Sequence, residues 1–394
     1  MTDPIVIVGG GAVGSAVAYF LMADPARDAP VVVVERDPTY ARASSALSAS
    51  SIRQQFSVPI NIALSRFGIA FLRDIGVRLA VDGEQPEIGL VEPGYLFLAS
   101  QAGLPVLEAN HRVQRAHGAD VALLDPDALR RRFPWLATDG LSAASLGLRG
   151  EGWFDGYAVL QALKRKARAL GAEYRKAAAV SLARVGDRID AVSLDDGSRL
   201  ACRAVVNAAG PWAARVAALA GIALPVQARR RSVFSFACHD KLPACPLVID
   251  PSGVWFRPEG ALFIGGVAPP ADQDPDEDPD AGSLEPDHRL FDDIVWPALA
   301  ARVPAFETIK PLRAWAGYYE HNTLDQNGIV GRHPAVTNFI FANGFSGHGI
   351  QQAPAVGRAV AELILHGRYR SLDLTPLGFE RVLEGAPLRE LNIV

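Results

Sequence analysis

Three glycines near the start of the chain, Gly9, Gly11 and Gly14, form the pattern G-x-G-x-x-G directly after a short apolar run. In this pattern the first glycine allows a tight turn, the second lets the backbone approach a pyrophosphate, and the third lets a helix pack closely on a strand. Glu35 ends a second apolar run roughly 20 residues further on, where a carboxylate accepts hydrogen bonds from a ribose hydroxyl. We therefore expect an ADP-containing ligand here, with its pyrophosphate on the amide groups of the helix start.

A second group of glycines meets a helix start near the other end of the chain. Gly344, Gly347 and Gly349 lie in the run G-F-S-G-H-G, which follows the apolar run 339–342 and precedes a helix predicted to reach His366. The amide groups and positive dipole end of such a helix favour negative charge. We expect both glycine groups to close on the same ligand.

The segments around these glycines predict the fold class. The apolar runs 5–8 and 31–34, together with the run 203–210, are typical of strands buried on both faces of a parallel sheet. Residues 226–266 instead contain several short strand patterns separated by turns, which indicates antiparallel pairing. The sequence predicts an α/β protein with a Rossmann-like domain and a second, α+β domain on a mixed or antiparallel sheet. A chain of 394 residues is also longer than one core usually serves.

Local signals predict several further elements. Asp125, followed by proline, predicts the first residue of a short helix. A longer helix is predicted over residues 157–170, closed by Gly171. Residues 173–184 and 188–194 predict the two strands of a hairpin.

Composition narrows the classes of function. The net charge is −4, 49% of the residues are hydrophobic, and no basic stripe interleaved with aromatic residues indicates nucleic-acid binding. No apolar run reaches the roughly 18 residues of a membrane-spanning helix. Three cysteines without a C-x-x-C pattern favour a reducing compartment, and the early first strand leaves no room for a signal peptide. A cytoplasmic location is therefore expected.

The acidic, proline-rich stretch 271–286 is predicted to be a solvated surface loop. Alternating aspartates from Asp272 onward imitate the start of a calcium-binding loop. However, Glu277 replaces the glycine at position six of such a loop, and Ser283 replaces the glutamate at position twelve. We therefore expect no metal site.

These residues resemble the D-amino-acid oxidase superfamily, in particular its glycine oxidase and sarcosine oxidase-like branch of FAD-dependent oxidoreductases. The resemblance covers nearly the whole chain. It depends on the first glycine group with Glu35, the pair Ser44-Ser45, residues 205–212 and 315–331, and the second glycine group. It implies an FAD-binding domain in three segments and a substrate domain in two. The FAD-binding segments are 1–85, 149–225 and 325–394, and the substrate-domain segments are 86–148 and 226–324.

The resemblance also implies which residues bind FAD, with Val180 contacting the adenine side through its backbone. The FAD is expected to be non-covalent, because this chain has no cysteine near Tyr318 and no histidine in residues 41–51, where relatives attach it. The cofactor-binding residues expected are Gly9, Gly11, Ala12, Val13, Gly14, Glu35, Arg36, Ser44, Ser45, Val180, Ala209, Gly210, Trp212, Gly344, Gly347, His348, Gly349 and Ile350.

The substrate side is expected to hold a carboxylate. Arg53 aligns with an arginine that binds the substrate carboxylate in sarcosine oxidase, and a guanidinium matches that group with two parallel hydrogen bonds. A second cation of that family is replaced by Gln351, so Arg257 or Arg313 is a candidate for its role. Further pocket or catalytic residues expected from the resemblance are Trp315, Tyr318, Tyr319, His321 and His348.

These expectations favour oxidation of a small amino acid or N-alkyl amino acid to an imine by hydride transfer to flavin N5. The electron acceptor, dioxygen or another molecule, stays open, because Phe263 aligns with a lysine that assists the reaction with dioxygen. A first alternative is a 2-hydroxy-acid dehydrogenase with His321 or His348 as base. A second is a flavin-binding assembly factor for a respiratory complex, since residues 53–57 also resemble such a branch. The oligomeric state stays open as well.

Overall fold

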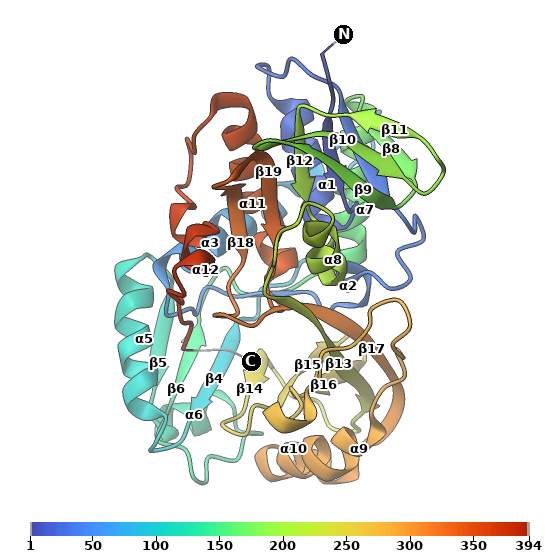
Figure 1. The fold of residues 1–394 in the computed structure, drawn as a ribbon. Coiled ribbons are helices and arrows are strands. Elements are labelled where there is room, and N and C mark those ends of the chain that lie inside the picture. The colour runs from blue at the N-terminus through green and yellow to red at the C-terminus, as the bar shows by residue number, and fades with distance from the viewer. Residues whose placement is uncertain (1, 392–394) are drawn as a thin grey trace.

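The computed structural model describes residues 2–391, and the chain folds into two parts stacked one above the other in Figure 1. The upper part contains a six-stranded sheet and the lower part an eight-stranded sheet. Segments from both halves of the chain form the upper part, because the first and last strands of its sheet in chain order are β1 and β19.

The upper sheet has the strand order β18-β19-β12-β1-β2-β8, and all neighbouring pairs are parallel except β18 with β19. Every residue of β1 and β12 is buried, as the apolar runs predict. The strands are β1 (Ile5–Val8), β2 (Val31–Glu35), β8 (Glu173–Lys176), β12 (Ala204–Asn207), β18 (Ile329–His333) and β19 (Val336–Asn343).

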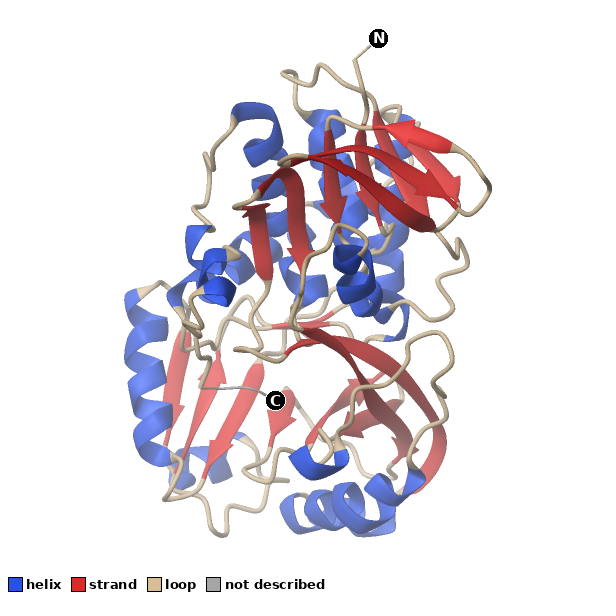
Figure 2. Cartoon of the chain, viewed as in Figure 1, coloured by secondary structure: helices blue, strands red, loops and turns tan. Residues whose placement is uncertain are grey.

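Most of the helices cover one face of this sheet, and a small antiparallel sheet together with the short helix 213–218 covers the other (Figure 2). Helix α1 packs against both α7 and α11, and α11 packs against α3. The helices are α1 (Ala12–Ala23), α3 (Pro59–Arg73), α4 (Ile75–Arg78), α7 (Gly156–Ala169), α8 (Ala213–Ala218), α11 (Gly349–His366) and α12 (Glu380–Leu383). The small sheet contains β9 (Ala179–Val185), β10 (Arg188–Leu194) and β11 (Arg199–Ala201).

The lower sheet has the order β17-β13-β16-β15-β14-β4-β6-β5, with one parallel pair, β14 with β4. Each of its strands lies within residues 86–148 or 226–324, and the exact domain boundaries stay a prediction. The strands are β4 (Tyr95–Ala99), β5 (Val121–Leu124), β6 (Ala143–Gly147), β13 (Val226–Ala237), β14 (Leu247–Ile249), β15 (Trp255–Glu259), β16 (Leu262–Gly266) and β17 (Lys310–Asn322).

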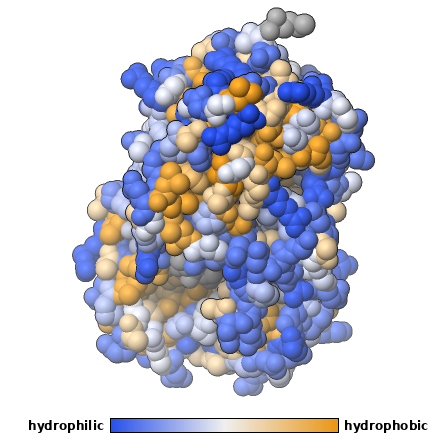
Figure 3. Space-filling view, in the orientation of Figure 1, coloured by the Kyte–Doolittle hydropathy of each residue, from blue (hydrophilic) through white to orange (hydrophobic). Residues whose placement is uncertain are grey.

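The remaining helices border the lower sheet or the junction between the parts. Helix α2 (Ser44–Leu47) lies at the junction, followed by the two-stranded ribbon of β3 (Ser51–Ile52) with β7 (Gly152–Trp153). The lower part adds α5 (Leu104–Ala116), α6 (Pro126–Arg132), α9 (His288–Leu290) and α10 (Trp296–Arg302). On the face drawn in Figure 3, hydrophobic and hydrophilic residues are interspersed over both parts. No helix within residues 2–391 is long and apolar enough to cross a membrane.

Local signals placed most element ends correctly, with one error. The Asp125 side chain accepts a hydrogen bond from the Ala128 amide at 2.7 Å, and Gly171 has φ +102° after the end of α7, as predicted. The expected single strand 173–184 is wrong. The chain leaves the upper sheet after β8, where the Ala177 amide donates to the Glu35 carbonyl, and only β9 forms the hairpin with β10.

Candidate active site

A cavity lies along the carboxyl ends of β1, β2 and β12 and reaches the junction with the lower part. This end of a parallel sheet is where ligands bind in open α/β folds. Most of the expected cofactor-binding residues line it, namely Gly9, Gly11, Ala12, Val13, Glu35, Arg36, Ser44, Ser45, Ala209, Gly210, Trp212, Gly347, Gly349 and Ile350.

The first glycine turn is tightly packed, and neither Gly9 nor Gly14 leaves room for a side chain. Gly9 has φ +101°, and a Cβ there would lie 2.3 Å from the Ala208 carbonyl oxygen. A Cβ on Gly14 would lie 1.9 Å from the Gly9 oxygen, so Gly14 serves packing and does not line the cavity. Gly11 itself supplies no capping side chain, and the Ala12 amide donates to the Ser45 hydroxyl at 3.3 Å. Both Gly11 and the first helical residues line the cavity. Amide groups of a helix start directed at a cavity fit a phosphate-containing cofactor.

The Glu35 carboxylate is held in place by backbone amides. Its Oε2 accepts from the Gly10 amide at 2.8 Å, and its Oε1 accepts from the Asp37 amide at 2.8 Å. Burial raises the pKa of Glu35, and these two hydrogen bonds act against that rise. A carboxylate oriented in this way at the cavity wall fits a ribose hydroxyl donor.

Val180 does not contact the cavity, contrary to the expectation. Its side chain is 50% exposed on β9, and the three residues before it, Ala177 to Ala179, line the cavity instead. The difference arises because the strand is interrupted between β8 and β9. This interruption brings these small residues against the end of β2. Gly344 also lies outside the lining, because its amide donates to Glu320 Oε2 at 3.0 Å.

The second glycine group forms the opposite wall. Gly347 has φ +96°, and a Cβ there would lie 2.5 Å from the Tyr319 ring. Glu320 lines the same wall, and burial raises its pKa to about 7. Sequence reasoning missed Glu320 as a site residue, although an acid within the aromatic run Y-Y-E-H is a usable signal.

Arg53, His348 and Gln351 come together beside this wall. His348 was expected among the cofactor-binding residues, but it does not line the cavity. Arg53 is 4% exposed, and its Nη2 lies 3.1 Å from His348 Nε2. Its Nη1 donates to the Gln55 carbonyl at 2.5 Å, and its guanidinium lies 4.1 Å from the centre of the Phe56 ring. Gln351 Oε1 accepts a hydrogen bond from the Arg53 backbone amide at 2.8 Å, so Gln351 orients the backbone of Arg53.

His348 is a neutral acceptor in this arrangement. Burial and the positive charge of Arg53 lower the pKa of His348 to about 3. A neutral imidazole can accept a hydrogen bond at Nε2 while donating at the other nitrogen. The ring therefore orients Arg53, which is a different role from the general base of the hydroxy-acid alternative.

Four other expected pocket residues lie outside the cavity lining. Trp315 Nε1 donates to the Leu47 carbonyl at 2.9 Å, and the Tyr318 hydroxyl donates to Glu277 Oε2 at 3.0 Å. His321 is partly buried on β17, where burial and nearby arginines lower its pKa.

Arg257 is the fourth of these residues, and its side chain has partners outside the cavity. It pairs with Glu259 and donates to the Ala49 carbonyl at 2.6 Å. Of the two adjacent tyrosines expected in the pocket, Tyr319 lines the cavity and Tyr318 does not, because successive side chains of a strand point to opposite faces.

The acidic loop 271–286 reaches the cavity, which its composition did not predict. Asp280 lines the cavity, lies 2.6 Å from Arg36 and 2.7 Å from Arg215, and accepts from Trp212 Nε1 at 2.8 Å. Arg42 donates to the Gly282 carbonyl at 2.6 Å. The loop thus ties the lower part to the cofactor end of the cavity.

Among the described residues that line the cavity, none is a cysteine or a histidine. This agrees with the expectation of a non-covalent cofactor, which stays a prediction. Phe263, expected over the flavin, packs in the lower core, with its ring centre 5.8 Å from that of Phe236 and 5.1 Å from that of Phe306. The position aligned with the family lysine therefore does not line the cavity.

Three features occur together in this chain: a glycine turn on a parallel sheet, a second glycine-rich helix start that faces it, and a separate sheet domain. This combination defines the class of two-domain dinucleotide-binding flavoproteins. The chain matches the family model described as DAO, FAD dependent oxidoreductase, over residues 4–363, and it belongs to that family. It is an FAD-dependent oxidoreductase related to amino-acid and N-methyl amino-acid oxidases.

Two relatives and one solved structure illustrate the relationship. The chain is 45% identical to FAD-dependent oxidoreductase domain-containing protein 1 of Xenopus laevis, over 99% of this chain and 84% of that protein. It is 27% identical to the mitochondrial sarcosine dehydrogenase of Mus musculus, over 93% of this chain and 40% of that protein. The crystal structure of L-proline dehydrogenase from P. horikoshii superposes with a TM-score of 0.85 at 26% identity, covering 98% of both chains.

Proposed function

We propose that this protein oxidises the Cα–N bond of a small amino acid or N-alkyl amino acid, with Arg53 binding the substrate carboxylate. The observation that carries the proposal is the hydrogen bond between Arg53 and His348 beside the cavity wall formed by Gly347 and Gly349. This places a buried guanidinium next to the helix start expected at the flavin. The names of several relatives specify glycine, dimethylglycine, sarcosine or 4-methylaminobutanoate, which are amino or methylamino acids.

In this reaction the main task of the protein's side chains is to orient the substrate relative to the flavin. Bound FAD supplies the acceptor for the hydride that leaves Cα, while the amine nitrogen loses a proton and the C–N bond becomes an imine, which water then hydrolyses. Arg53 fixes the carboxylate end of the substrate, since its planar fork matches two carboxylate oxygens. Holding Cα at about 3–3.5 Å from the acceptor atom is the geometric requirement for such a transfer.

Neighbouring groups hold Arg53 in one orientation. His348 accepts from Nη2, the Gln55 carbonyl accepts from Nη1, and the Phe56 ring lies under the guanidinium. A side chain locked in this way loses little rotamer freedom on binding, which favours affinity for the carboxylate. The same burial excludes water and strengthens the attraction between opposite charges.

The test is an anaerobic screen of the purified flavoprotein. Glycine, sarcosine, dimethylglycine, L-proline and 4-methylaminobutanoate are added singly, with L-lactate as the hydroxy-acid probe, and the loss of flavin absorbance is followed. We expect at least one amino acid to reduce the flavin and lactate to leave it oxidised. Reduction by lactate alone would replace the proposal with the hydroxy-acid alternative. No reduction by any probe, together with co-purification of a large respiratory complex, would favour the assembly-factor alternative.

A further inference from the structure

Residues 53–58 connect β3 to α3 as an irregular segment, and most of it is buried. Arg53, Gln54, Gln55 and Phe56 are each at most 6% exposed. Buried amide groups outside helices and sheets need acceptors from elsewhere, because an unsatisfied one costs free energy comparable to a lost hydrogen bond. The conformation of this segment therefore depends on the side chains that supply those acceptors.

Two acceptors hold the first half of the segment. The Arg53 amide donates to Gln351 Oε1 at 2.8 Å, and the Gln54 amide donates to Glu151 Oε1 at 2.6 Å. Gln55 Nε2 also donates to Glu151 Oε2 at 2.8 Å. Both Gln351 and Glu151 are buried, so these contacts are shielded from water.

A single carboxylate, Glu390, holds the second half. Its Oε1 accepts from both the amide and the hydroxyl of Ser57 at 2.5 Å, and its Oε2 accepts from the Val58 amide at 3.2 Å. Asn61 Nδ2 donates to the same Oε2 at 3.2 Å. Glu390 is 5% exposed. An ionised carboxylate has only acceptor sites, so it can satisfy all four of these donors at once.

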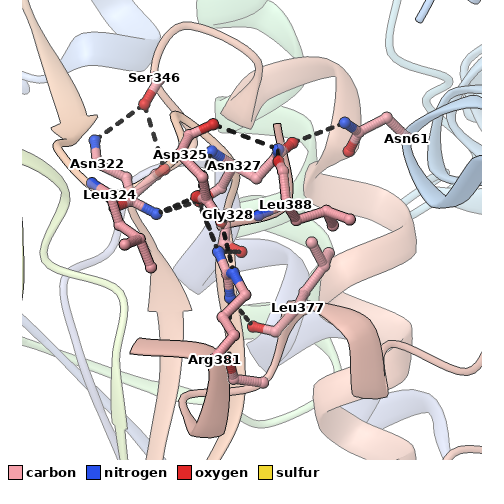
Figure 4. A network of polar contacts seen from close by, with 12 residues as sticks. Asn61, Asn322, Leu324, Asp325, Asn327, Gly328, Ser346, Leu377, Arg381 and Leu388 are labelled. Carbon is pink, nitrogen blue, oxygen red and sulfur yellow. Dashed lines mark hydrogen bonds and ion pairs between the residues drawn. The ribbon is translucent and has the colours of Figure 1, made fainter. Parts of the chain in front are cut away.

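The tail that carries Glu390 is itself anchored at a buried ion pair. Arg381 Nε lies 2.8 Å from Asp325 Oδ2, and the same oxygen accepts from the Leu388 amide at 2.9 Å. Figure 4 shows this network, in which Asn327 donates to the Leu388 carbonyl. Leu391 then donates its amide to the Ser57 hydroxyl at 2.8 Å. The tail is thus connected to the upper domain on one side and to residues 53–58 on the other.

We propose that Glu390 is a positioning residue for the substrate: by holding the amides of Ser57 and Val58, it sets the segment that presents Arg53 to the substrate carboxylate. The proposal rests on the role of Arg53 proposed above. Charge is consistent with it, because burial lowers the pKa of Arg53 and the negative charge of Glu390 acts against that lowering. Through this contact Glu390 would act on the substrate side of the cavity, although Glu390 itself does not line the cavity.

The test compares Glu390→Gln with Glu390→Asp and with the control Glu384→Gln, whose side chain is exposed on the same tail. Glu390→Gln keeps the size of the side chain but places an amide donor against donors. We expect its KM for the best amino acid of the screen to rise about tenfold, equivalent to about 1.4 kcal/mol, with kcat and FAD content near those of the unaltered protein. Glu390→Asp should restore part of the affinity, and Glu384→Gln should change neither constant.

Arg53→Lys, measured in parallel, separates the two claims. If Arg53→Lys raises KM and Glu390→Gln does not, the positioning role is wrong and the role of Arg53 stands. If neither raises KM, the proposed function of Arg53 fails, and the positioning role fails with it. Should Glu390→Gln not fold, Ser57→Ala removes only the hydroxyl contact and should raise KM in the same direction by a smaller factor. An unchanged KM in Ser57→Ala would then overturn the proposal.

Discussion

Arg53 and His348 are 295 positions apart in the sequence, and their side chains meet with 3.1 Å between Nη2 and Nε2. Arg53 follows the first strand of the small ribbon β3–β7, whereas His348 precedes helix α11. The contact therefore joins the segment after this ribbon to the start of α11, beside the cavity wall that contains Gly347 and Gly349. Because His348 is neutral at this site, it places no second positive charge beside the guanidinium.

Glu35 is expected to determine how tightly FAD is held. Replacing Glu35 by alanine removes the carboxylate that faces the cavity and leaves the Gly10 and Asp37 amides without their acceptor. The affinity for FAD should fall by about 1–3 kcal/mol, the cost of losing charge-assisted hydrogen bonds. Equilibrium titration of the apoprotein with FAD measures this, and an unchanged dissociation constant would refute the assignment.

The mode of FAD attachment has a simple test. Acid precipitation of the flavoprotein should release the yellow colour into the supernatant. Tyr318 occupies the position of the cysteine that attaches FAD in the resembled sarcosine oxidases, and its hydroxyl donates a hydrogen bond to Glu277 Oε2. Colour that stays with the pellet after washing would show a covalent bond.

Part of this site could be predicted from the sequence because the signal is local. The turn at Gly9, the helix start at Gly349 and the buried strand β1 each depend on neighbours within a few residues. The contact of Ser57 with Glu390 spans 333 positions, and no local pattern indicates it. The same holds for Glu151, which reaches Gln54 over 97 positions.

Errors of one residue arose where a backbone detail decides which side chain faces the ligand. Both Tyr318 and Tyr319 were expected to line the pocket, but the alternation of side chains along β17 places only the second of these two at the cavity. Val180 was expected at the adenine side, and the break before β9 puts Ala179 there instead. Pattern reasoning identifies such segments, and the register follows only from pairing with strands far away in the chain.

Asp280 is expected to slow the release of FAD. It joins Arg36 and Arg215 at the edge of the cavity, and Asp280→Asn removes the charge that holds this loop there. FAD should dissociate faster from Asp280→Asn than from the unaltered protein, and added salt should accelerate release less in the variant because fewer ion pairs remain to be screened. Rates are measured by the recovery of flavin fluorescence after dilution.

The matched control for this prediction is Asp272→Asn, because Asp272 is exposed in the same acidic loop. It should release FAD at the rate of the unaltered protein. Equal rates in both variants at every salt concentration would show that the loop does not retain the cofactor.

Glu151 should make the protein less stable as the pH rises toward neutral. Burial raises the pKa of Glu151 from 4.5 to about 7, so the folded protein binds a proton that the unfolded chain has lost in this window. This group makes its full contribution to the free energy of unfolding below pH 4.5. The contribution is lost as the pH rises through about 7. Glu151→Gln should flatten this decline without abolishing it, because Glu320 has a similarly raised pKa. Urea unfolding between pH 4.5 and 7.5 measures the slope, and an identical slope in the variant would contradict the prediction.

The central claim, that Arg53 binds the carboxylate of an amino-acid substrate, has one direct measurement. The rate of anaerobic flavin reduction is determined in the unaltered protein and in Arg53→Lys, with the best amino acid of the screen and with the matching amine that lacks the carboxylate. We predict that Arg53→Lys loses about 2–5 kcal/mol of apparent substrate binding with the amino acid and almost nothing with the amine, at equal FAD occupancy. Equal losses with both substrates, or no loss with the amino acid, would contradict the account.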